Sequence, residues 1–162
     1  CRRGHNIPTR PSGPGAARQM KKWPSSFNSK PGLQLMLALL MPTVETALRM
    51  HVETWLRLLS VGDWRAAVSM LDAPNSYGIQ WGEAEIRNLI DEYARGKLWC
   101  ITSPETLHTS GRMSFGEFND GSGYYFYYDI PLNREWSDLT AQFEFRKRGN
   151  GYAFVLHDMY VL

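Results

Sequence analysis

Four side chains of this sequence have the chemistry that proton transfer requires. An enzyme that isomerises or dehydrates a small molecule needs a carboxylate or histidine as general base. It also needs a tyrosine or protonated acid beside the developing oxyanion, with all groups directed into an apolar pocket. Residues of these types lie on an expected helix and two expected strands. The candidate ligand-binding pocket consists of His51, Tyr127, Asp129 and His157. We assign no catalytic residue.

Each of these residues also has a structural explanation, which we favour. His51 is expected to be a partly buried histidine bonded to a neighbour, and the tyrosines from Tyr124 to Tyr128 have the strand propensity of packed aromatic residues. His157 and Asp158 are adjacent, so a regular strand directs them to opposite faces and they cannot form a dyad. Asp63 is expected to cap a helix.

Other site chemistries have no support in the sequence. The four histidines are far apart, and no cysteine or carboxylate pair has the spacing of a structural zinc site, so we expect no metal and no cofactor. The run Gly121-Ser122-Gly123 lacks the lysine and the helix of a phosphate-binding loop. No serine lies in a nucleophile-elbow context.

Charge is distributed unevenly along the chain. The net charge is +2, but residues 1–30 contain seven basic residues and no acidic one. The remaining 11 basic and 16 acidic residues give residues 31–162 a formal charge of −5. A nucleic-acid-binding domain needs clustered Lys and Arg, so we expect no nucleic acid to bind this part. An acidic surface could instead steer a basic protein, as an immunity protein does for a basic toxin.

The cysteines and the hydropathy of the sequence indicate the cellular compartment in which we expect the protein. Cys1 and Cys100 do not suggest a disulfide framework, so a reducing compartment is the simplest interpretation, and we expect a cytoplasmic protein. The apolar run Leu33–Met41 has nine residues, far short of the roughly 20 that a membrane-spanning helix needs. We therefore expect no membrane association.

The elements that must position the candidate residues follow from hydrophobic periodicity. We predict a disordered basic tail or a non-native upstream segment over residues 1–41 and a single domain over residues 42–162. This domain should contain helices at 43–59, 63–71 and 83–95. It should continue as strands at 98–102, 106–118, 124–132, 139–147 and 152–161, the last two joined at Gly149-Asn150-Gly151. Helices followed by an antiparallel meander define an α+β fold.

Several short motifs resemble a known superfamily. The segments L-L-S-V-G-D-W at 58–64 and G-E-A-E-I at 82–86, followed by the strands, are similar to nuclear-transport-factor-2-like domains. That resemblance implies three helices packed on a curved antiparallel sheet that forms a cone. Within this superfamily, S-D-L-T at 137–140, the aromatic strand 123–132 and H-D-M-Y-V-L at 157–162 resemble a bacterial domain-of-unknown-function family. The resemblance covers residues 42–162.

The superfamily includes enzymes, ligand binders and interaction modules, so its fold selects no function. We expect a non-enzymatic protein-binding or dimerisation module, with a protein partner or a second copy. The alternative is an isomerase or dehydratase, or a binder of a small apolar ligand, that uses the cone pocket. The state of that pocket separates them: an open cavity beside Tyr127 favours the enzyme, and filling by Trp55, Phe143 and Phe154 disfavours it.

Overall fold

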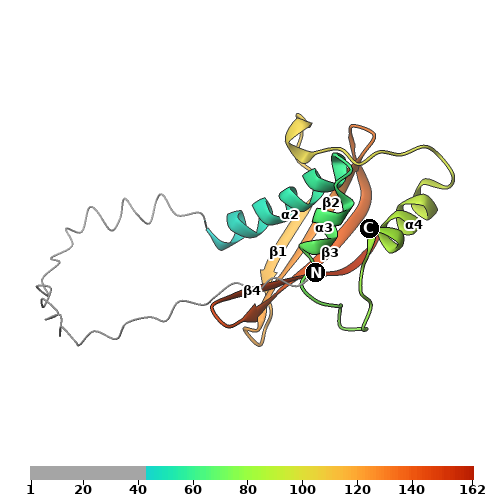
Figure 1. Ribbon diagram of the computed structural model, residues 1–162. Coiled ribbons are helices and arrows are strands. Elements are labelled where there is room, and N and C mark those ends of the chain that lie inside the picture. Colours follow the sequence, from blue (N-terminus) through green and yellow to red (C-terminus); the bar gives the residue numbers. More distant parts are fainter. Residues whose placement is uncertain (1–42) are drawn as a thin grey trace, which may run out of the picture. The chain divides into compact units, whose positions relative to one another are not determined.

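A computed structural model describes residues 43–162, and the predicted tail at residues 1–41 lies outside this range. Figure 1 shows three helices followed by a sheet, the predicted α+β order. The helices lie close to the expected positions, although the second is shorter than predicted. The elements are α2 (Val44–Ser60), α3 (Trp64–Ser69), α4 (Glu83–Ala94), the 3-10 turn η1 (Pro104–Thr106), β1 (Met113–Glu117), β2 (Gly123–Leu132), β3 (Glu135–Arg148) and β4 (Gly151–Val161).

The four strands form one antiparallel sheet in the order β1-β2-β3-β4. Each strand pairs only with its neighbours in sequence, and β1 and β4 remain separate edges. The sheet is neither closed nor strongly curled, so the cone expected from the nuclear-transport-factor-2-like resemblance is not observed. Closure of a sheet depends on the number of its strands and on their tilt and stagger, and these four strands leave β1 and β4 apart.

The predicted first strand is replaced by a segment that clamps a turn. Residues 98–102 make a single bridge, between Ile101 and Leu132. The amide of Cys100 donates to the side chain of Asn133 (2.9 Å), and Thr102 accepts from the amide of Arg134 (2.8 Å). Asn133 and Arg134 both have positive φ, as the two-residue turn between β2 and β3 requires. Two backbone hydrogen bonds, from Thr102 to Pro131 and from Asn133 to Cys100, complete this short contact.

The predicted second strand starts seven residues later than expected. Pro104 begins η1, where its fixed φ suits a tight turn and its missing N–H costs nothing. The chain enters β1 only at Met113. The last hairpin is confirmed: Arg148 pairs with Gly151, and Gly149 has the positive φ that its turn needs.

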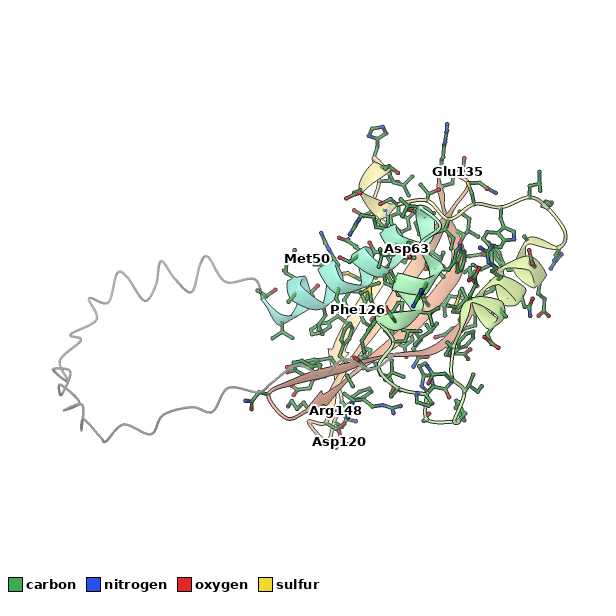
Figure 2. The ribbon with its side chains drawn as sticks, viewed as in Figure 1. Met50, Asp63, Asp120, Phe126, Glu135 and Arg148 are labelled. Carbon is green, nitrogen blue, oxygen red and sulfur yellow. The ribbon has the colours of Figure 1, made fainter. Side chains whose placement is uncertain are left out.

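A layer of aromatic side chains fills the space between α2 and the sheet. The rings of Trp55 and Phe143 lie 5.3 Å apart, and those of Phe143 and Phe154 lie 5.0 Å apart. All three side chains are buried. Burying one such side chain stabilises a fold by roughly 1.5–3 kcal/mol. Figure 2 shows the side chains of α2 meeting those of the sheet, while Met50 on the far side of α2 remains exposed.

Candidate functional site

His51 lies on the helix side of the sheet. Its ring meets that of Phe154 edge-on at 4.6 Å and that of Phe145 at 6.0 Å. Burial against these rings lowers the pKa of His51 below its ordinary value, and the negative charge of Asp72 partly opposes this effect. His51 therefore lies on the flank of α2, with one side of its ring against Phe154 and the rest of the side chain exposed.

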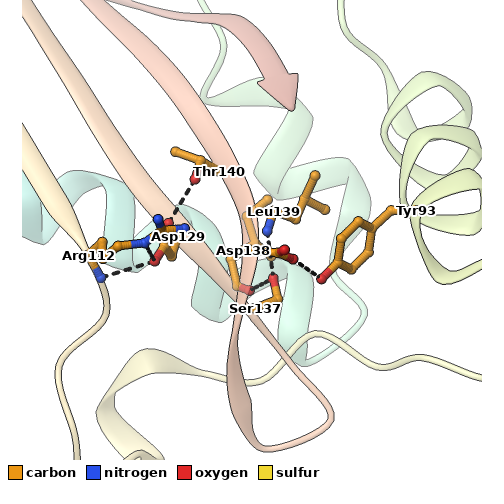
Figure 3. Close-up of polar contacts among 8 residues, drawn as sticks. Tyr93, Arg112, Asp129, Ser137, Asp138, Leu139 and Thr140 are labelled. Atoms are coloured by element: carbon orange, nitrogen blue, oxygen red, sulfur yellow. Dashed lines mark hydrogen bonds and ion pairs between the residues drawn. The ribbon is translucent and has the colours of Figure 1, made fainter. Parts of the chain in front are cut away.

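Asp129 belongs to the opposite face. Tyr128 donates to Glu53 of α2 (2.9 Å), so its neighbour Asp129 points away from the helices. The carboxylate is buried and accepts from the amide of Arg112 (3.1 Å), from Nε of Arg112 (3.0 Å) and from the hydroxyl of Thr140 (2.7 Å; Figure 3). These donors occupy both oxygens, so Asp129 connects three segments of chain instead of presenting a free base.

His157 occupies a β-bulge. Gln142 pairs with Asp158 and Phe143 pairs with Leu156, which leaves His157 as the additional residue of β4. The bulge interrupts the regular alternation and directs His157 to the same face as Glu144. This corrects the expectation that His157 and Asp158 must point to opposite faces, since that argument assumed a regular strand.

The surroundings of His157 are polar and aromatic. Its Nδ1 lies 2.8 Å from Oε1 of Glu144, a close contact that lacks the geometry of a hydrogen bond. The other oxygen of Glu144 accepts from Arg146 at 2.6 Å, and the ring of Tyr77 lies 5.4 Å from that of His157. The cluster holds the loop before α4 against β4.

Tyr127 is half-buried on this same face, which we call the outer face because the described helices lie over the other one. Its ring is 5.6 Å from that of Tyr125. Burial, followed by the proximity of Tyr127 and Asp158, raises the pKa of Tyr160. Five neighbouring side chains of the outer face form what we call the tyrosine patch: Tyr125, Tyr127, Gln142, Asp158 and Tyr160.

The four candidate residues therefore do not meet in one pocket. Tyr127, Asp129 and His157 share the outer face, whereas His51 lies behind the sheet, next to the filled layer of Trp55, Phe143 and Phe154. Two grooves within residues 43–162 have volumes of about 1150 and 960 Å³. Neither is lined by any of the four residues. Their binding of a ligand stays a prediction.

The S-D-L-T segment has structural partners at every position. The hydroxyl of Ser137 donates to the carbonyl of Ile130 and accepts from the amide of Leu139. Ile130 lies where the register between β2 and β3 shifts, so Ser137 bonds to a carbonyl at this irregularity. Asp138 accepts from Tyr93 of α4, and Thr140 donates to Asp129, as Figure 3 shows. The segment therefore ties α4 to the sheet and the sheet to the loop before β1.

Sequence reasoning missed Arg112 and Glu144 as partners of the candidate residues. Their positions carry no local signal, because each meets its partner across the sheet. Within residues 43–162, no three His, Cys, Asp or Glu side chains are grouped so that they could hold a metal ion. In the same range, no helix is both long and apolar enough to cross a bilayer.

Fold and site together define a small α+β domain with helices on one face of an open sheet and a tyrosine-rich opposite face. Comparison with family models matches residues 57–162 to a domain of unknown function (DUF7668), and the chain belongs to this family. This match confirms the prediction of a domain-of-unknown-function family. Comparisons with curated proteins and with solved structures gave no match.

Proposed function

We propose that this domain binds another protein through the tyrosine patch and catalyses no reaction. The observation that carries the proposal is the contrast between the two faces of the sheet. The helix side is filled by Trp55, Phe143 and Phe154. The outer face, in the described part of the chain, has no helix over it and keeps partly exposed tyrosines.

The chemistry of the patch suits a protein interface. Tyrosine offers a large apolar ring with few rotamers to immobilise and a hydroxyl that can bond to a partner, which explains its enrichment at interfaces. A tyrosine hydroxyl is protonated at neutral pH and can donate to a carbonyl. The raised pKa of Tyr160 extends this protonated state to higher pH. Exposed Asp158 adds a negative charge, which favours a partner with a basic or neutral contact surface.

The alternative function, an isomerase or dehydratase, has weaker support. Such an enzyme needs a free base facing a water-excluding cavity. Asp129 is instead occupied by Arg112 and Thr140, and His51 packs against Phe154. A distant relation to nuclear-transport-factor-2-like domains also stays a prediction.

Site-specific photo-crosslinking tests the proposal. A photoreactive phenylalanine analogue replaces Tyr127 in one variant and exposed Met50 of α2 in the control, and both are expressed in the cells from which the chain comes. We expect a discrete protein adduct from position 127 that position 50 does not give. Adding Tyr160→Ser should reduce the yield several-fold. Equal labelling from both positions, or no adduct at position 127, would contradict binding through the patch.

A further inference from the structure

The backbone groups at one edge of the sheet are covered and those at the other edge are not, and this difference points to a second interface. At the β4 edge, the amide of Asp72 donates to the carbonyl of Phe154 (2.8 Å), and the amide of Phe154 donates to the carboxylate of Asp72 (2.8 Å). Further along, the side-chain amide of Asn75 donates to the carbonyl of His157 (2.7 Å). The segment between α3 and α4 thus covers the outward backbone groups of β4.

The β1 edge has no such cover in residues 43–162. The carbonyl of Arg112 accepts from the amide of Asp129, and the amide of Phe118 donates to the carbonyl of Gly123. Even-numbered residues of this segment therefore turn their backbone groups toward β2, since the direction alternates along an antiparallel strand. The N–H and C=O groups that point outward belong to Met113, Phe115 and Glu117, and no described residue bonds to them.

β1 also lacks most of the features that keep an exposed strand from pairing. It contains no proline and no lysine, and its register with β2 runs without a bulge from Met113 to Glu117. Its helix-side residues Met113 and Phe115 keep part of their apolar surface exposed. Its outer-face residues, Ser114 and Gly116, are small, and the side chain of Tyr125 lies across Gly116.

We propose that two copies of this chain pair antiparallel through their β1 edges, so that the two sheets join into one continuous sheet. The three outward-facing residues are symmetric about Phe115, and a two-fold axis there lets all of them exchange hydrogen bonds. Phe115 then faces the second copy's Phe115, an aromatic cross-strand pair, and Met113 faces the second copy's Glu117.

Other registers are poorer. A shift of two residues leaves one outward residue of each copy without a partner, and centring the axis on Glu117 sets two carboxylates opposite each other. In the proposed register, Ser114 lies opposite the second copy's Gly116 at the closely spaced positions, where small side chains fit. The pairing goes beyond the proposed function, because it uses the strand edge and leaves the tyrosine patch of each copy free.

Sedimentation of the full chain over a range of concentrations tests this pairing. We expect a reversible monomer–dimer equilibrium. Phe115→Lys sets two lysines opposite each other and should raise the dissociation constant by at least about tenfold. Met113→Pro removes one outward N–H without breaking a bond to β2, so it should weaken the dimer even if Phe115→Lys is poorly folded. The control Val161→Lys, on exposed β4 surface, should leave the equilibrium unchanged.

Amide hydrogen exchange adds a positional readout. The amides of Met113, Phe115 and Glu117 should become more protected as the concentration rises, and that of Ser114, already bonded to β2, should not change. A chain that stays monomeric at all concentrations would overturn the pairing. So would a dimer that both edge variants leave intact but Tyr127→Ser disrupts, a result that would place the copies at the tyrosine patch. A monomer that still gives a specific adduct at Tyr127 would overturn the pairing while supporting the proposed function.

Discussion

A buried carboxylate organises the outer face of this domain. Asp129 is 3% exposed, yet its charge is compensated by Arg112 and by a hydrogen bond from Thr140. The Arg112 side chain remains 58% exposed, so water screens the pair and reduces its contribution. Asp129 therefore stabilises the fold mainly by accepting hydrogen bonds from three donors that would otherwise be left without a partner.

Replacing Asp129 should destabilise the fold. Asp129→Asn keeps the size but exchanges one acceptor oxygen for an NH2 group, and it should lower the free energy of unfolding by about 2–3 kcal/mol. Thr140→Val removes only the hydroxyl donor and should cost about 1 kcal/mol. Denaturant unfolding monitored by fluorescence measures both. A change below about 0.5 kcal/mol for Asp129→Asn would show that the network is dispensable.

His51 should make stability depend on pH. Because burial lowers the pKa of His51 in the folded protein, the unfolded chain binds more protons. The free energy of unfolding should therefore decrease as the pH falls below about 6.5, the ordinary value for histidine. His51→Gln should lose less stability than the native chain between about pH 7.5 and pH 5.5. Parallel curves for the two proteins would mean that other groups cause the dependence.

At the scale of elements, the loop between α3 and α4 protects the β4 edge through Asn75. Its side-chain oxygen accepts from the amides of Tyr77 (3.0 Å) and Ile79 (2.9 Å), and its NH2 group donates to the carbonyl of His157 (2.7 Å). One buried amide thus folds the loop and fixes it to the strand.

Two substitutions separate these roles. Asn75→Ala should cost about 2–4 kcal/mol, since three hydrogen bonds are lost at a buried position. Asn75→Asp keeps both acceptor contacts but sets a carboxylate oxygen against the carbonyl of His157, so it should cost at least as much and speed amide exchange mainly near His157. Thermal unfolding and hydrogen exchange would measure these effects. A much smaller loss for Asn75→Asp than for Asn75→Ala would indicate that the contact with β4 contributes little.

At the scale of the whole molecule, the sheet and the aromatic layer between it and α2 lie within residues 43–162. We predict that a chain starting at Met41 unfolds as cooperatively as the full chain, with a Tm within about 3 °C. Calorimetry of both chains would measure this difference. A much lower Tm for the shorter chain would show that residues before Met41 stabilise the domain.

Local patterning was sufficient for much of the architecture. Helical periodicity placed α2 and α4, and Gly149 marked the last turn. These features depend on contacts within a few residues, which a single sequence contains. The β-bulge at His157 is absent from such patterns, because pairing with β3 and contacts with distant segments impose it.

The sequence by itself determined the α+β class and the domain-of-unknown-function family, since composition, periodicity and short motifs are local properties. Only the tertiary structure decided that His51 is separated from Tyr127, Asp129 and His157 and that the sheet stays open. It also decided that one edge is covered and the other is free. These outcomes depend on how strands pair and which face the helices cover, and pairing partners far apart in the chain leave no periodic signal.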